Sequence, residues 1–157
     1  MATTKSAQVQ SARVRGNWRG ADFTEYGTID VTTAPAVGDI FELVQIPNGY
    51  AVESVILDCD SLDSNATPTI VLEVGDATTA ARFIAASTVA QHGGVQYSNV
   101  AGATGYSYAI GTNNGQFSGG NAGATVIQAK VTAAAATFAA GNIRLAVRLF
   151  LPNGAFA

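Results

Sequence analysis

Residues 142–149, with the sequence NIRLAVRL, alternate between two kinds of side chain over their whole length. Ile143, Leu145, Val147 and Leu149 are large and apolar, whereas the residues between them are Asn, Arg, Ala and Arg. Successive side chains of a β-strand point to opposite faces of a sheet, so this period of two predicts a strand with one buried face. Such a strand requires a second apolar layer to cover that face.

Comparable short stretches recur along the chain and end at turn residues. They cover residues 12–19, 23–31, 39–46, 52–59, 69–74, 106–110 and 127–131. The sequence Pro47-Asn48-Gly49 is typical of a tight turn, because proline presets one turn dihedral and Asn-Gly tolerates positive φ. Many short strands without crossover helices predict an all-β fold, an antiparallel β-sandwich that is jelly-roll-like.

Residues 78–90 fit two kinds of local structure. Asp76 is a favoured N-cap type for a helix over residues 80–84, whereas the Ser-Thr-Val sequence of residues 87–89 favours extended chain. We expect a short helical turn followed by extended chain.

The domain organisation is simple. A chain of 157 residues suffices for one domain with a single core. The first eleven residues are small and polar without apolar periodicity, which is typical of an arm. We therefore expect an extended N-terminal arm with the first strand in residues 1–20 and a single β-sandwich domain in residues 21–157.

Composition excludes several classes of protein. Apolar residues make up 48% of the chain and charged residues only 12%, which argues against intrinsic disorder and against a charged coiled coil. No apolar run is long enough for a membrane-spanning helix, and the N-terminal sequence lacks the apolar block of a secretory signal. Cys59 is the single cysteine, so no internal disulfide can form. These features predict a soluble domain made in a reducing cytoplasm.

The charges are divided into three blocks. Residues 1–21 contain four bases and no acid, residues 22–76 contain all eleven acids and no base, and residues 77–157 contain the remaining four bases. Pairs between sequence neighbours cannot neutralise such blocks. The acidic and basic segments must therefore meet across the fold, between subunits or on another charged partner.

The chain offers few groups for catalysis. His92 is the only histidine and lies in the sequence Gln91-His92-Gly93-Gly94, which is typical of a solvated loop. Cys59 shares the phase of Val55 and Leu57, so we interpret it as a small apolar residue on the buried face of a strand. We expect no enzymatic activity, no catalytic residue and no cofactor.

The most metal-like sequence is the acidic run Asp58–Asn65. Hard cations such as Ca²⁺ take several oxygen ligands from a tight loop, but this run lacks the glycine and distant glutamate of a helix–loop–helix calcium site. We interpret it as a strand end that leads into an acidic turn and expect no metal site, although calcium stays an alternative.

The basic residues near the N-terminus have two further interpretations. Arg13, Arg15 and Arg19 share one face of the strand expected at residues 12–19, and Trp18 falls on the other face. A nucleic-acid surface needs positive side chains interleaved with aromatic ones, so we expect no nucleic-acid partner. The arginines fit a solvated edge strand, or an arm that binds an acidic surface of a neighbour.

The order of several short motifs, from about Ile46 to Phe150, resembles a family of bacteriophage head-decoration proteins, also called capsid cement proteins. The motifs are Ile46-Pro47-Asn48-Gly49-Tyr50, Val74-Gly75-Asp76, Arg82-Phe83-Ile84, Thr104-Gly105-Tyr106, Ala136-Thr137-Phe138 and Gly141-Asn142-Ile143-Arg144-Leu145-Ala146-Val147. All are turn and strand patterns, and none is a catalytic signature. Residues 1–45 contribute nothing to the resemblance.

The resemblance implies a jelly-roll homotrimer that binds the outer surface of a phage capsid. Such a protein is made in the host cytoplasm, becomes part of the virion and clamps neighbouring subunits of the major capsid protein. We expect no nucleic-acid and no membrane partner. The candidate contacts to the capsid or to other subunits are the basic residues Lys5, Arg13, Arg15, Arg19, Arg144 and Arg148.

A second class of function stays open. A head-fibre or adhesion module that binds a receptor or glycan would use the polar loop Thr112–Gly123 together with Tyr106 and Tyr108. Tyrosines that alternate along one strand face are more often part of a core, so we favour the cement function.

Overall fold

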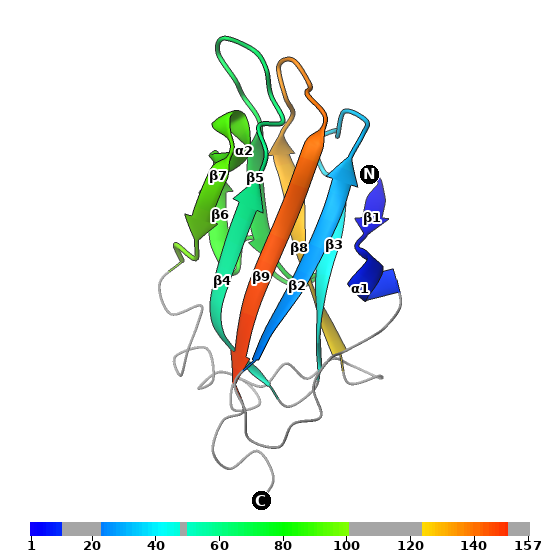
Figure 1. The fold of residues 1–157 in the computed structure, drawn as a ribbon, viewed down its shortest axis with the longest axis vertical. Helices are drawn as coiled ribbons and strands as arrows, with labels where there is room; N and C mark the ends of the chain where they lie inside the picture. The colour runs from blue at the N-terminus through cyan, green and yellow to red at the C-terminus, as the bar shows by residue number, and fades with distance from the viewer. Residues whose placement is uncertain (11–22, 48–49, 101–123, 151–157) are drawn as a thin grey trace, which may run out of the picture.

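The computed structural model describes residues 1–10, 23–47, 50–100 and 124–150, and within them it contains nine strands and two short helices (Figure 1). The strands are β1 (Thr3–Lys5), β2 (Phe23–Val31), β3 (Ile40–Pro47), β4 (Ala51–Cys59), β5 (Val71–Gly75), β6 (Ile84–Ser87), β7 (Gly94–Tyr97), β8 (Ala124–Ala133) and β9 (Gly141–Phe150). The helices are α1 (Ala7–Gln10) and α2 (Val89–His92).

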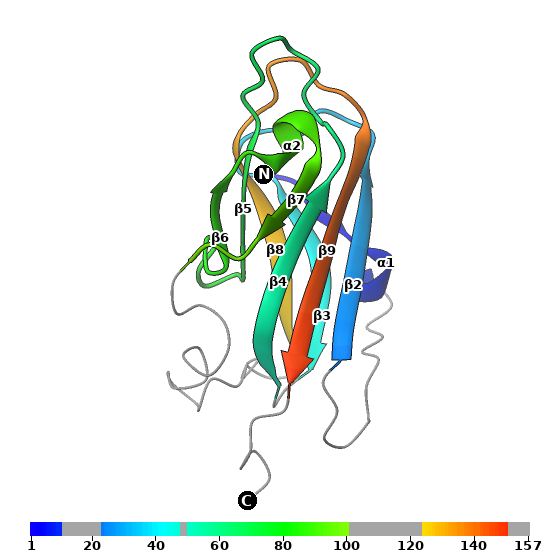
Figure 2. The same ribbon diagram turned by 60° about the vertical axis from the view of Figure 1, so that its left-hand side comes forward.

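The strands form two sheets that lie face to face (Figure 2). One sheet has the order β1-β3-β8-β5-β6 and the other the order β2-β9-β4-β7. From β2 to β5 successive strands alternate between the sheets, and apart from β1 each sheet has four strands. This is the eight-stranded arrangement of a jelly roll, so the expected all-β sandwich is confirmed.

The period of two in the sequence correctly identifies the inward faces. In β9, Ile143, Leu145, Val147 and Leu149 are fully buried, while Arg144 and Arg148 lie on the outer face. The expected strands at residues 23–31, 39–46, 52–59, 69–74 and 127–131 correspond to β2, β3, β4, β5 and β8. Most side chains of the core between the sheets are aliphatic or aromatic, including Leu43, Leu57, Leu72, Phe83 and Ile127.

One close approach between the sheets depends on a glycine. Gly27 lies at an inward position of β2, and a Cβ atom there would overlap the main-chain carbonyl of Leu43 in β3. No side chain fits at this position, so the glycine allows the two sheets to approach each other at this corner.

The segment from residue 78 to residue 90 differs from the expectation. Instead of a helical turn over residues 80–84, the chain makes a non-helical turn and enters β6 at Ile84, and the helix α2 follows the strand. Asp76 still accepts hydrogen bonds from the main-chain N–H groups of Thr78 and Thr79, as an N-cap would. Phe83 and Ile84 are fully buried, and this demand of the core outweighs the local helix signal.

The first ten residues, expected as an arm, run along the edge of β3. β1 pairs with β3 in parallel, with Thr3, Thr4 and Lys5 opposite Ile40, Phe41 and Glu42. The strands expected at residues 12–19 and 106–110, and the boundary between residues 20 and 21, lie outside the described residues.

Candidate interaction face

The outward face of the β2-β9-β4-β7 sheet carries a row of apolar side chains. The strand register places Tyr26 beside Ala146, Ala146 beside Ile56, and Ile56 beside Tyr97. Tyr26 is 68% exposed and Tyr97 is 63% exposed, and Val95 of the same β7 strand is 53% exposed. We call Tyr26, Ala146, Ile56 and Tyr97 the tyrosine row; Val95 lies beside it, in register with Asp58.

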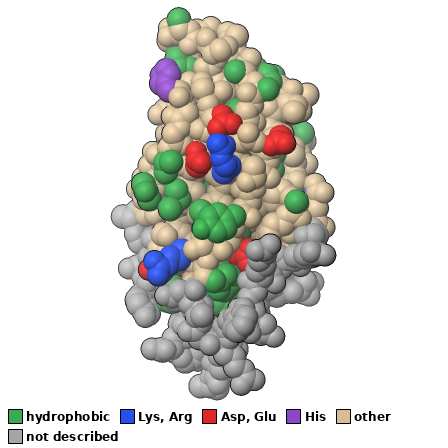
Figure 3. Space-filling view, in the orientation of Figure 1, with side chains coloured by type: hydrophobic (Ala, Val, Ile, Leu, Met, Phe, Trp, Pro, Cys, Tyr) green, Lys and Arg blue, Asp and Glu red, His purple; other side chains and the backbone are tan. Residues whose placement is uncertain are grey.

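Ion pairs flank the tyrosine row on both sides. Figure 3 looks onto this sheet and shows hydrophobic side chains across the middle of the face, with basic side chains beside acidic ones above and below them. On one side, the Arg144 guanidinium lies 3.3 Å from Asp58 and 2.6 Å from Asp60. On the other side, Nε of Arg148 lies 2.8 Å from Glu53.

Asp60 is held by more than its arginine. The main-chain and side-chain amides of Asn142 donate to Oδ2 at 2.9 and 3.0 Å, and Arg144 donates to Oδ1. The two Asn142 hydrogen bonds, with the nearby Arg144 charge, lower the pKa of Asp60 from its ordinary value. The carboxylate therefore stays ionised and keeps Arg144 oriented along the face.

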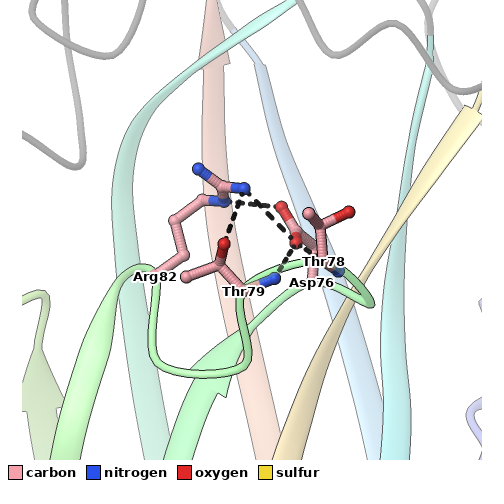
Figure 4. A network of polar contacts seen from close by, with 4 residues as sticks. All are labelled: Asp76, Thr78, Thr79 and Arg82. Atoms are coloured by element: carbon pink, nitrogen blue, oxygen red, sulfur yellow. Dashed lines mark hydrogen bonds and ion pairs between the residues drawn. The ribbon is translucent and has the colours of Figure 1, made fainter.

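The remaining described bases are also paired. Lys5 contacts Glu42 at 3.0 Å, and Lys130 contacts Glu73 at 3.5 Å. Figure 4 shows the third pair, in which Nε of Arg82 donates to Asp76 at 2.6 Å and a second guanidinium nitrogen donates to Thr79.

The charge blocks could be neutralised across the fold, between subunits or on another partner. In the described residues, the acidic and basic segments meet across the fold. Each base described there, Lys5, Arg82, Lys130, Arg144 and Arg148, pairs with an acid from residues 22–76. Arg82 and Asp76 are only six positions apart, so one pair does join near neighbours in sequence, contrary to the expectation. Antiparallel pairing of β9 with β4 brings together the pairs on the sheet face.

The acidic run Asp58–Asn65 uses its carboxylates to organise the chain. Asp63 is 2% exposed and accepts hydrogen bonds from four main-chain N–H groups, those of Asn65, Thr69, Ala136 and Thr137. Burial acts to raise the pKa of Asp63, but the four donors outweigh it and hold the pKa below its ordinary value. Among the described residues, no group of three histidine, cysteine or acidic side chains is placed to hold a metal ion.

The two residues considered for catalysis lie in different environments. Cys59 is buried, and burial, followed by the nearby Asp58 charge, raises the pKa of its thiol to about 12. It therefore lies among apolar neighbours as a protonated core residue. His92 is exposed as expected, but it is the last residue of α2 and not part of a loop.

The predicted contact residues are divided between two places. Arg144 and Arg148 lie on one face, on either side of the tyrosine row, whereas Lys5 lies at the edge of the other sheet. Arg13, Arg15 and Arg19, and the loop and tyrosines of the adhesion alternative, lie outside the described residues. Tyr26, Ile56 and Tyr97 are not among the contact residues predicted from the sequence. Their signal is that large apolar residues occupy the outward phase of β2 and β4.

Two solved capsid structures contain chains similar to this one. A chain of the cyanophage Pam1 capsid asymmetric unit is 32% identical, with a TM-score of 0.66, over 89% of this chain and 92% of that one. The chain belongs to a family of phage capsid proteins. A chain in the capsid of Ralstonia phage GP4 is also similar to this protein, at 26% identity and a TM-score of 0.75, over 98% of this chain and 100% of that one.

No family profile matches the sequence, and no curated protein matches it. The assignment to the capsid family therefore rests on the solved structures alone. This assignment supports a viral structural protein that is part of the virion. In the described part of the chain, no helix is both long and apolar enough to cross a membrane.

Proposed function

We propose that this protein is a capsid decoration protein that binds the outside of a phage shell and stabilises it by clamping neighbouring subunits of the major capsid protein. The single observation that carries the proposal is the tyrosine row on the outward face of the β2-β9-β4-β7 sheet. The similarity to chains of two phage capsids supports a capsid protein as the partner.

The composition of the face suits a protein partner. Interfaces between proteins bury aromatic anchors at their centre and keep polar groups at the rim. Tyr26 and Tyr97 stand on hydrogen-bonded strands, so little conformational entropy is lost when they are covered. Arg144 and Arg148, each already paired with an acid, supply the polar rim.

The same face suits nucleic acid poorly. Binding to phosphate backbones requires basic side chains that are free to replace counterions. The described bases are all engaged with acids of the same protomer. We therefore keep the expectation of no nucleic-acid and no membrane partner as part of the proposal.

The finer parts of the proposal come from the sequence. A decoration protein of this kind is a homotrimer on the outer capsid surface, made in the host cytoplasm and without catalytic activity. Its contacts include the basic residues Lys5, Arg13, Arg15, Arg19, Arg144 and Arg148. Arg144 and Arg148 stay candidates because their side chains are partly exposed on the face that carries the tyrosine row.

The deciding experiment removes the two exposed aromatic anchors. The double substitution Tyr26→Ser and Tyr97→Ser is compared with Val37→Ser, which changes an exposed apolar residue away from this face. We expect affinity for undecorated capsids to fall roughly tenfold or more in the double variant, because truncating a buried interface aromatic typically costs more than about 1 kcal/mol. Unchanged affinity, with a folded variant by circular dichroism, overturns the assigned face.

Copy number separates the decoration function from the adhesion alternative. Quantitative mass spectrometry of purified virions measures this chain against the major capsid protein. Comparable numbers support a decoration protein that covers the lattice. A small fixed number of copies per particle supports a fibre or adhesion module and overturns the proposal. The temperature at which heated particles release their DNA, measured with and without the protein, then tests the clamping itself.

A further inference from the structure

The edge of β3 is a strand-binding site, and residues 2–8 of the chain occupy it. The main-chain N–H of Ile40 donates to the carbonyl of Ala2, and the N–H of Ser6 donates to the carbonyl of Glu42, both at 2.8 Å. These bonds extend the parallel pairing of β1 with β3. An extended peptide that adds to a sheet edge in this way is a known mode of peptide recognition.

Side chains make the match specific beyond the main chain. The side-chain amide of Gln8 both donates to the carbonyl of Gln45 at 3.2 Å and accepts from its N–H at 2.7 Å. It thereby replaces the main chain of a strand after β1 has ended. The Ser6 hydroxyl donates to the carbonyl of Leu43. The site therefore recognises a serine and, two positions later, a glutamine.

The two partners are also complementary in charge. Asp39 accepts from the main-chain N–H of Ala2 at 2.6 Å, and Lys5 pairs with Glu42 at 3.0 Å. Hydrogen bonds from Ala2 and Ala36 lower the pKa of Asp39, which keeps the acceptor ionised. The acidic edge therefore selects a segment that carries a base and no acid, as residues 1–10 do.

The segment is held by its edge contacts and not by the core. All side chains of β1 are exposed, and among residues 1–10 only Ser6 is buried. Removing the segment therefore opens no cavity in the sandwich, and its detachment costs the edge hydrogen bonds and the ion pair, which an identical edge can restore. A bare β3 edge would nevertheless expose unpaired main-chain groups, which an added strand can pair with.

We propose that on the assembled shell the β3 edge binds residues 2–8 of a neighbouring copy of this chain, so that adjacent copies exchange their N-terminal segments. Exchange replaces each contact by an identical one and needs no new interface. Twelve residues, 11–22, connect α1 to β2, and a linker of that length reaches at most about 40 Å. The inference rests on the proposed function in one respect, because the shell is what places copies side by side.

Close packing allows the exchanged form to compete with the unexchanged form. A segment tethered to one protomer experiences its own β3 edge and a neighbour's edge at effective concentrations set by the linker and the spacing. Where the shell brings a neighbour's edge within reach of the linker, exchanged segments tie the copies into a connected layer. The exchange gives the decoration function a way to link copies without adding contact area to the sheet face.

The test is a disulfide placed across the site. Lys5 and Glu42 are register partners, so K5C and E42C bring two thiols together wherever a segment occupies an edge. In the double variant on oxidised particles, we expect most of the cross-linked chain to run as covalent oligomers on a non-reducing gel. A disulfide that leaves every chain at protomer mass overturns the exchange. Thr3 and Ile40 supply a second register pair if the first variant folds poorly.

Mixed particles provide the matched control. K5C alone and E42C alone cannot form the designed bond, so particles made with both single variants give a dimer of one of each only if segments exchange. Buried Cys59 is left unchanged in every variant. If the protein is absent from particles, the proposed function fails. The same oxidation of the purified protein at high concentration then decides the exchange by itself, because protomer-mass products overturn it and oligomers support it.

Discussion

Oδ1 of Asp63 accepts a hydrogen bond from the main-chain N–H of Thr137 at 2.9 Å, although the two residues are 74 positions apart. Oδ2 of the same carboxylate accepts from Ala136 and Thr69. Two loops that lie side by side at one end of the sandwich, between β4 and β5 and between β8 and β9, are thus joined through one acidic side chain (Figure 1).

Replacement of Asp63 by asparagine is expected to destabilise the fold. The amide group would place a donor where the main chain presents only donors, leaving buried N–H groups unsatisfied. Urea unfolding should show a clearly lower midpoint for Asp63→Asn than for Asp30→Asn, a change at an exposed position of β2. Equal midpoints would contradict the role given to Asp63.

The stabilisation by Asp63 should depend on pH with a definite sign. Its pKa is lower in the folded chain than the value of about 3.9 of an unperturbed aspartate, so its contribution is complete above about pH 4 and is lost as the pH falls toward the folded-state pKa. The difference in urea midpoint between the wild-type protein and Asp63→Asn should therefore shrink as the pH is lowered below 4. A difference that grows on acidification would show that the sign is wrong.

Gly27→Ala should be far more damaging than its size suggests. The new methyl group would overlap the main-chain carbonyl of Leu43, which cannot rotate away as a side chain could. We expect a loss above the about 1–3 kcal/mol typical of overpacked cores. Thr28→Ala, at the next and exposed position, should stay within about 0.5 kcal/mol. Thermal unfolding of both variants provides the comparison.

The thiol of Cys59 should be inert in the native protein. Its pKa of about 12 leaves almost no thiolate at pH 8, and its burial blocks access of reagents. Titration with a coloured disulfide reagent should give no reaction in native buffer and one thiol per chain after unfolding in guanidinium. Rapid labelling of the folded protein would refute the assignment of Cys59 to the core.

The fold was predictable where the information is local. Residues 142–149 repeat their period on a single strand, so the sequence alone identifies β9 and its buried face. The order of the strands within each sheet depends on contacts between residues that are distant in sequence. The register of β9 with β2 and β4 is therefore not contained in any one strand's pattern. The segment around Ile84 shows the limit, since the core required a strand where Asp76 indicated a helix.

The candidate site was predictable only in part. The charge blocks indicated pairing over long distances, yet no sequence pattern specifies that Arg144 lies opposite Asp58, because that depends on register. Tyr26 and Ile56 carry a signal that could have been used, since each is a large apolar residue in an outward phase. Gly93 could likewise have indicated the end of α2, because a glycine directly after a helical segment is a sequence signal for a helix end.

The position of β9 between β2 and β4 affects the kinetic stability of the fold. Its partners are distant in sequence, with Phe23 opposite Leu149 and Ala51 opposite Phe150. Chains that depend on such pairing fold slowly, typically over milliseconds to seconds, because large loops must close before any contact forms. The lifetime of the folded protein is then set by its rate of unfolding, which requires β9 to separate from β2 and β4.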